Sequence, residues 1–439
     1  MVIAKKSILT LWVACLVSTI ATGADAFHDG SVAECEGCHT MHNSSPGSSG
    51  SVNPLAPFTG NRNLLLASDP SSVCLNCHQQ AGDLGPTAFH VSTPESEAPA
   101  GVPPKQLTPG GDFGWLRKSY SWIPAFGQPA SYSYGERHGH NIVSADYGFI
   151  ADATKTAAPG GSYPALSLSC ISCHDPHGRY RRNEDGSITE TSKPVKGSGS
   201  YATSPDPGSD GAVGAYRLLG GVGYYPKSQS NVLAFSNPPP AAVAPEDYNR
   251  SENVSVTRVA YGSGMSQWCQ NCHPFVHGDS DPTEVRRHPA GNSGEAILDA
   301  NMLDDYNMYL KTGDLSGFQA TSYFSLVPFE VGTSDYAVLK GIAANTPTQG
   351  PSSADGQAAV MCLTCHRAHA SGWDSATRWN SKTENVVYNG NYSQQGEMYQ
   401  PYGQGRTEVE AAGAYYDTPA SKFALMQKSL CNKCHIRDN

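Results

Sequence analysis

The chain has 439 residues, with 29 Lys and Arg against 39 Asp and Glu, and a formal net charge of −10 at pH 7. This acidic balance argues against a nucleic-acid-binding protein, because such proteins carry basic surfaces. Glycine and proline together make up about 17% of the chain, compared with about 12% in an average protein. We therefore expect abundant turns and irregular backbone, and a core that something other than secondary structure organises.

The first 26 residues have the pattern of a secretory signal peptide. Lys5 and Lys6 precede an apolar run over residues 8–21, and small residues lie before Phe27. The run is too short for a membrane-spanning helix, and a cleavage site follows it. We expect residues 1–26, with Cys15, to be removed, and residues 27–439 to form one exported domain that does not span a membrane.

Six copies of the pattern CxxCH account for every cysteine of the mature chain. Two thiols about one helical turn apart can bond the two vinyl groups of a porphyrin, and the imidazole that follows can reach the iron. The pattern therefore predicts six haem c groups per chain. The cysteines are Cys35, Cys38, Cys74, Cys77, Cys170, Cys173, Cys269, Cys272, Cys362, Cys365, Cys431 and Cys434. The motif histidines are His39, His78, His174, His273, His366 and His435.

Other uses of paired cysteines fit this pattern poorly. Zinc sites often contain CxxC pairs but do not require a histidine directly after each pair. Six short-range disulfides would cross-link almost nothing distant and would leave the histidines unexplained. A thioredoxin-type CxxC would occur once, beside a βαβ pattern that this sequence does not show.

Nine histidines remain as possible second ligands of the six irons. His42, His177 and His369 follow a motif histidine by three residues, and His277 by four. A histidine so close in sequence lies on the same side of the ring as its own motif histidine, so we expect it to bind a neighbouring haem. An exposed loop position remains the alternative, most of all for His277.

The other histidines stand in the long intervals between motifs or at the start of the mature chain. We expect ligands at His90, His140 and His288, where turn-like sequence could fold back onto a haem. His138 lies two residues from His140, so we expect it to be exposed and not a ligand. His28 is a weaker candidate, as is His277. Arginines near motif or ligand histidines could pair with haem propionates or simply carry surface charge: Arg137, Arg179, Arg181, Arg182, Arg286 and Arg287.

Helical signals are few. Residues 295–311 place Leu298, Met302, Tyr306 and Leu310 on one stripe, which predicts a helix. Residues 418–435 predict another, with Thr418 as N-cap and Pro419 in its first turn. We expect a multihaem cytochrome c fold of mostly coil and turns, with a few short helices and very little strand, around a continuous stack of six haems.

Histidine on both faces of every iron would give low potentials and leave no open position for substrate, so we expect electron transfer and not catalysis. A monomeric periplasmic or outer-surface electron shuttle is one alternative. A multihaem reductase is another, although it would need a five-coordinate iron, often from an altered motif such as CxxCK.

Stretches between the motifs carry a more specific resemblance. They include "VAECEGCHTMHNS", "TPGGDFGWL", "CISCHDPHGRYRR", "TRVAYGSGMSQWCQNCH", "LVPFEVGTSDYAVLKG" and "CLTCHRAHASGWDS". Over essentially the whole mature chain, the sequence resembles the OmcS-type hexahaem cytochromes of metal-reducing bacteria, which polymerise into extracellular cytochrome filaments.

The resemblance implies a secreted protein at the cell surface, in a head-to-tail filament through which the haem stack continues. It implies that His42 ligates a haem of the adjacent subunit. It also implies electron donors among periplasmic or outer-membrane cytochromes and extracellular acceptors such as metal oxides or other cells. A head-to-tail interface of this kind generates an open filament and not a closed ring.

Overall fold

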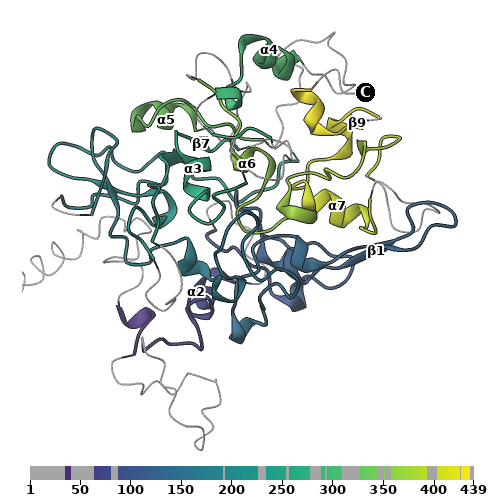
Figure 1. Ribbon diagram of the computed structural model, residues 1–439, viewed down its shortest axis with the longest axis horizontal. Helices are drawn as coiled ribbons and strands as arrows, with labels where there is room; N and C mark the ends of the chain where they lie inside the picture. Colours follow the sequence, from purple (N-terminus) through teal and green to yellow (C-terminus); the bar gives the residue numbers. More distant parts are fainter. Residues whose placement is uncertain are drawn as a thin grey trace, which may run out of the picture.

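The computed structural model describes residues 35–40, 64–80, 88–190, 193–225, 234–253, 257–276, 288–291, 294–308, 327–343, 351, 357–392, 403–425 and 427–435. The α-helices in these ranges are α2 (Pro70–His78), α3 (Met265–Cys269), α4 (Ala300–Met308), α5 (Tyr336–Ile342), α6 (Cys362–Cys365) and α7 (Glu408–Ala414). None of them is long and apolar enough to cross a membrane. Turns and irregular backbone connect these short elements (Figure 1), as the glycine and proline content predicts.

The strands are only two or three residues long and pair antiparallel in four small sheets. One sheet is a hairpin of β1 (Tyr120–Trp122) and β2 (Ser131–Ser133), which extends from one side of the molecule (Figure 1). A second sheet has the order β4-β3-β5, and β6 pairs with β7 and β8 with β9. The strands are β1 (Tyr120–Trp122), β2 (Ser131–Ser133), β3 (Arg181–Arg182), β4 (Ile188–Thr189), β5 (Val213–Gly214), β6 (Ala242–Val243), β7 (Ala260–Tyr261), β8 (Asn385–Val387) and β9 (Gln427–Lys428).

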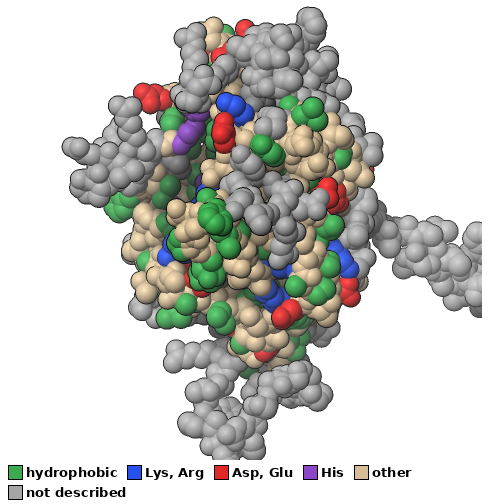
Figure 2. Space-filling view, turned by 90° about the vertical axis from the view of Figure 1, so that its right-hand side faces the viewer, with side chains coloured by type: hydrophobic (Ala, Val, Ile, Leu, Met, Phe, Trp, Pro, Cys, Tyr) green, Lys and Arg blue, Asp and Glu red, His purple; other side chains and the backbone are tan. Residues whose placement is uncertain are grey.

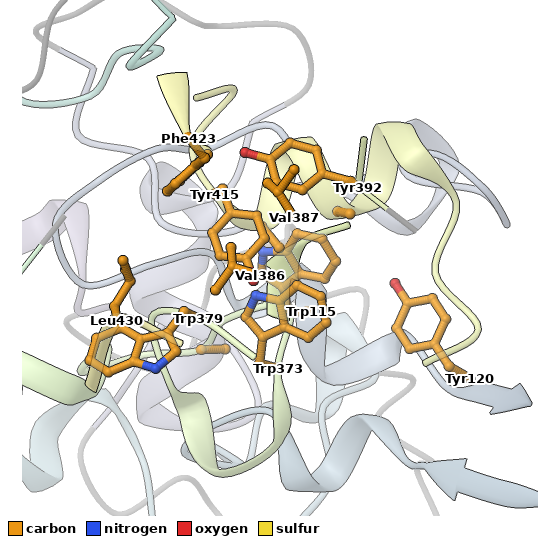
Figure 3. Packing of buried hydrophobic residues seen from close by; sticks show 13 residues of the cluster. Trp115, Tyr120, Trp373, Trp379, Val386, Val387, Tyr392, Tyr415, Phe423 and Leu430 are labelled. Carbon is orange, nitrogen blue, oxygen red and sulfur yellow. The ribbon is translucent and has the colours of Figure 1, made fainter. Parts of the chain in front are cut away.

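Buried side chains form several separate clusters instead of one core. The largest is aromatic and brings Trp115 together with Trp373, Trp379, Tyr392 and Tyr415, although these residues come from distant parts of the sequence (Figure 3). Partly buried motif cysteines pack against this cluster and four others: Cys365, Cys173, Cys269, Cys434, Cys170 and Cys272. The apolar interior therefore continues directly into the CxxCH motifs, as expected if porphyrins complete it.

The two predicted helices differ in outcome. The first is present but shorter, because a 3-10 turn at Gly294–Ala296 precedes α4 (Ala300–Met308); Leu298 and Tyr306 are buried, and Leu310 lies outside the described residues. The second prediction is wrong, since Pro419 has extended backbone (φ −68°, ψ 143°) and a strand, β9, interrupts the segment. Pairing of β9 with β8 outweighs the local helical preference there.

Candidate haem sites

All six CxxCH motifs contain a helical turn, of either α or 3-10 type. Each lies on one helical turn: η1 (Cys35–Gly37), α2, η7 (Cys170–Ser172), α3 with the turn after it, α6, or η14 (Leu430–Lys433). In a helical turn, residues three apart lie on one face, so both thiols of a motif point the same way. Outside α2, the motif histidine's backbone N–H donates to the carbonyl of the first cysteine at 2.8–3.1 Å. The motif thus presents two thiols and one imidazole as a single unit.

Four motif histidines have the ring of a second histidine opposite them. Each second histidine comes from a distant part of the chain and is one of those predicted as a ligand. The ring-centroid distances are 6.5 Å for His39 and His177, 6.3 Å for His174 and His369, 6.0 Å for His140 and His273, and 5.9 Å for His288 and His435.

This spacing suits two imidazoles on opposite faces of one metal ion. An imidazole nitrogen binds a metal at about 2.0–2.1 Å, and its ring centroid lies about 1.2 Å further out, so two centroids should be about 6–6.5 Å apart. Direct ring stacking would bring the centroids closer, toward the short end of the 4.5–7 Å range of aromatic pairs. The four pairs therefore match an interposed iron in distance.

Backbone carbonyls lie at Nδ1 of several of these imidazoles. Nδ1 of His174 lies 2.7 Å from the Arg217 carbonyl oxygen, and Nδ1 of His140 lies 2.7 Å from that of Ala368. The same arrangement occurs at His78, His273, His288 and His366, at 2.7–2.9 Å. A carbonyl at Nδ1 selects the tautomer with a lone pair on Nε2, the form that binds a metal.

The protein also favours the neutral form that a ligand requires. Burial, with a contribution from His273, lowers the pKa of His140 to about 4. Burial together with His174 lowers the pKa of His369 to about 3. A metal-binding imidazole must be neutral, so at neutral pH both histidines are in the protonation state that can bind a metal. The side chain of His140 is nevertheless accessible to solvent, although it is surrounded by protein on the side of its Nδ1 hydrogen bond.

A short backbone ladder fixes His140 and His369 beside one another. The His140 N–H donates to the His369 carbonyl at 2.9 Å, and the His369 N–H donates to Gly110 at 2.7 Å. Ala370 forms bridges with both Gly111 and Gly139. Because His140 faces His273 and His369 faces His174, one ladder positions imidazoles of two different histidine pairs.

The expectation that His138 is exposed is wrong, since its side chain is completely buried. Its Nδ1 lies 3.0 Å from the Trp115 carbonyl oxygen, and its Nε2 lies 2.8 Å from Ser133 Oγ and 3.3 Å from Arg406. Both ring nitrogens are engaged by the protein. His138 therefore has a structural role beside the ladder. It differs from His140 and His174, for which only a hydrogen bond at Nδ1 is described.

The remaining second-ligand candidates are less defined. His90 is buried, and the Phe89 ring contacts both His90 and His78, with centroid distances of 4.6 Å and 5.5 Å. His28, His42 and His277 lie outside the described residues.

On the face shown in Figure 2, histidine side chains of the described residues reach the surface beside hydrophobic ones.

Cysteines of successive motifs are neighbours in space. Two pairs are joined by thiol hydrogen bonds, Cys74 with Cys170 and Cys269 with Cys362. In three further pairs the second thiol contributes to a raised pKa of the first: Cys77 acts on Cys38, Cys272 on Cys173, and Cys431 on Cys365. These pairs link the six motifs one after another in the order of the sequence.

The predicted propionate partners are mostly engaged elsewhere. Arg137 and Arg179 are partly exposed near carboxylates, and Arg182 is buried with its guanidinium on the Gly186 and Pro239 carbonyls. Arg181 donates to the Lys193 carbonyl. Arg286 and Arg287 lie outside the described residues.

Sequence reasoning missed a different set of arginines. Arg367, Arg378 and Arg406 are 4% exposed or less. Of the three, only Arg367 could have been singled out from the sequence, because it is the one basic residue that directly follows a motif histidine. The paired imidazoles, the thiols on one face of a turn and these buried cations together fit haem c with its two propionates.

Comparison with known proteins identifies the family of the chain. No family model matches the chain. The c-type cytochrome OmcS of Geobacter sulfurreducens is 54% identical over 421 residues, which cover 95% of this chain and 96% of the relative. A cryo-EM structure of OmcS nanowires from the same organism has a TM-score of 0.83 at 52% identity. A structure of the Outer Membrane Cytochrome S filament has a TM-score of 0.83 at 53% identity.

The two filament structures match 94% of this chain and 100% of their own chains. Identity above half over nearly the full length leaves little room for a different fold or cofactor class. The chain therefore belongs to the OmcS family of c-type cytochromes.

Proposed function

We propose that this protein carries electrons over long distances outside the cell, through six bis-histidine haems per subunit in a head-to-tail filament. The observation that carries the proposal is the set of four histidine pairs, each joining a CxxCH histidine to a histidine from a distant segment. The family relationship supports the filament, since the related structures are nanowires. Haem supplies one-electron chemistry, and the chain fixes its position and surroundings.

Four irons would be held by the four pairs just described, with His177, His369, His140 and His288 as second ligands. His90 and His42 are the best candidates for the other two second ligands, and His28 and His277 are weaker. His42 would come from the adjacent subunit, which joins the haem row of one subunit to the next. Every iron would then be six-coordinate, which favours electron transfer over catalysis.

The order of the cysteine neighbours supports one unbroken haem row. Each motif contributes a cysteine that adjoins a cysteine of the next motif, from Cys38 and Cys77 through to Cys365 and Cys431. Adjacent attachment points keep porphyrin edges close, which rapid transfer between haems requires. We therefore propose that electrons pass along the haems in sequence order.

Export by the signal at residues 1–26 would place the mature domain, residues 27–439, outside the cell. Its partners would be other copies of itself, cytochromes of the periplasm or outer membrane that supply electrons, and extracellular acceptors. A monomeric shuttle would use the same haems without polymerisation, so the oligomeric state separates the two functions.

The decisive experiment replaces His42 with alanine in the exported, haem-loaded protein. We expect filaments to disappear from electron micrographs while six haems per chain remain in a pyridine haemochrome assay. Asn43→Ala is the matched control and should leave filaments intact. Filaments of normal length from His42→Ala would contradict a ligand role across the interface. A high-spin haem signal in the wild-type spectrum would contradict six-coordination and revive a reductase.

A further inference from the structure

His369 differs from other proposed ligands in how its ring is held. In six of them, Nδ1 lies 2.7–2.9 Å from a backbone carbonyl oxygen. The corresponding distance from His369 Nδ1 to the Gly111 carbonyl oxygen is 3.4 Å. Hydrogen bonds from nitrogen to oxygen are usually about 2.7–3.2 Å long, so this contact is weak. Other groups must therefore fix the plane of the His369 ring.

The ring of Phe113 stacks on the ring of His369. Their centroids are 4.7 Å apart and their planes differ by 24°, which lies within the range of favourable aromatic pairs. Phe113 is 4% exposed, and its ring also makes an edge contact with Phe149 at 6.3 Å. Its N–H donates to the Val91 carbonyl at 2.9 Å. Phe113 is therefore held on several sides and cannot turn away from His369 without opening a packed cluster.

A buried carboxyl group fixes the turn that carries Phe113. Asp112 is completely buried and accepts hydrogen bonds from the backbone N–H groups of Gly114, Thr93 and Gln106, at 2.6, 2.9 and 3.0 Å. One side chain thus joins three segments of backbone around the residue before Phe113. The position of the Phe113 ring is set by this network and not by His369.

The backbone of Gly110 also lies close to the His369 ring. A Cβ atom added at Gly110 would be 2.9 Å from Nδ1 of His369 and 3.1 Å from its Cε1. A side chain at position 110 would therefore displace the ring. The His369 N–H donates to the Gly110 carbonyl at 2.7 Å, which keeps the two residues together. Phe113 and Gly110 thus define the plane in which this imidazole lies.

The plane of an axial imidazole affects the iron that it binds. The π orbital of the ring overlaps with iron d orbitals, so the angle between two axial rings decides how far those d orbitals split. His369 and His174 make an angle of 61°, whereas His39 and His177 are nearly parallel at 10°. A hydrogen bond at Nδ1 also makes the imidazole a stronger donor, which stabilises oxidised iron. The weak contact at Nδ1 makes His369 a weaker donor than its counterparts.

We infer that Phe113 is a positioning residue for electron transfer through the haem of His174 and His369, because its ring, with the Gly110 backbone, sets the plane of the His369 imidazole. The inference rests on the proposed haem content. Phe113 acts through His369 and does not touch the iron. It keeps the imidazole away from a short bond to the Gly111 carbonyl, and thereby keeps the potential of this haem higher than a fully hydrogen-bonded imidazole would.

Electron paramagnetic resonance of the oxidised, haem-loaded protein tests the ring plane. Phe113→Leu removes the stack and should shift the low-spin signal of one haem, as the imidazole turns toward the Gly111 carbonyl. The affected signal is assigned by its absence from His369→Met. Phe149→Leu is the matched control, because it removes a buried ring of the same cluster that contacts Phe113 and not His369. It should lower stability and leave the signal unchanged.

A redox titration gives a second readout. Phe113→Leu should lower the midpoint potential of the same haem, with a roughly three- to tenfold change in its reduced-to-oxidised ratio; tenfold is ~59 mV for one electron. Phe113→Tyr keeps the stacked ring and should retain the wild-type potential. An unchanged signal and an unchanged potential in Phe113→Leu overturn the inference. Equal changes in Phe149→Leu also overturn it, because they would assign the effect to packing alone.

A second variant decides if Phe113→Leu fails to accumulate. Gly110→Ala places a methyl group against the His369 ring and should shift the same signal, whereas an unchanged spectrum overturns the inference. Haem counting separates this inference from the proposed function. Fewer than six haems in the wild-type protein would contradict the proposed function itself. Six haems with the wild-type signals in every variant would contradict the role of Phe113 alone.

Discussion

Replacing His138 with leucine should cost about 2 kcal/mol of stability at pH 7. The side chain makes two buried hydrogen bonds, to the Trp115 carbonyl and to Ser133. Both partners keep a bond after the change, because the Lys118 N–H also donates to the Trp115 carbonyl and the Ser133 hydroxyl can donate to Asp374 in place of Nε2. The loss is therefore the net value of two hydrogen bonds, about 0.5–1.5 kcal/mol each, and not the larger penalty of orphaned groups.

The sign of the pH dependence follows from the same burial. Burial and the neighbouring Arg406 lower the pKa of His138 to about 3. Below pH ~6.5 the unfolded chain takes up a proton at this histidine and the folded chain does not. The wild type therefore loses about 1.4 kcal/mol per pH unit at this site as the pH falls, and the leucine variant does not. The two stabilities should become equal near pH ~5.

Guanidinium unfolding followed by near-ultraviolet circular dichroism, at several pH values from 7 to 4.5, would measure both effects. Other titrating groups are common to the two proteins and cancel in the difference. His138→Asn is the matched control, because its amide can still donate to the Trp115 carbonyl and should recover about half of the loss. A stability difference that stays constant between pH 7 and 4.5 would refute a buried, neutral His138.

Two further predictions concern the ladder. A methyl group at Gly111 would collide with the Ala370 carbonyl oxygen, whereas one at Gly127 would meet nothing within 4 Å, and both glycines have positive φ (92° and 75°). Gly111→Ala should therefore destabilise the protein by about 1–3 kcal/mol more than Gly127→Ala in thermal unfolding; equal losses would contradict the close approach. His369→Met should raise the potential of one haem in a redox titration, and six unchanged potentials would argue against ligation by His369.

The local chemistry of the sites was predictable from sequence because it depends on short spacing. The CxxCH pattern fixes two thiols and one imidazole within a single turn, and all six copies adopt that turn. The argument that His177 and His369 should avoid their own motif's iron also agrees with their positions opposite His39 and His174. These inferences needed only the direction in which neighbouring side chains leave the backbone.

Burial was not predictable in the same way. His138 and His140 have nearly identical sequence surroundings, yet one is completely buried and the other is exposed. The difference arises from Ser133, five residues away, and from the distant Arg406, which both contact the His138 ring. Arg367 was missed for the same reason, since only the packed structure shows that its Nε and Nη2 lack a partner.

The short elements of this fold raise the question of what holds distant segments together. Isolated helices shorter than about 12–15 residues are marginal in water, and the longest described here have nine. If the four histidine pairs each bind one iron, each closes a loop on the order of 100–200 residues, for which the chain-entropy estimate is about 4–5 kcal/mol. Three of these loops, 39–177, 140–273 and 174–369, overlap in turn along the sequence, and 288–435 overlaps the last of them. Iron ligation would then cross-link nearly the whole chain, so the cofactors that carry the electrons would also determine the fold.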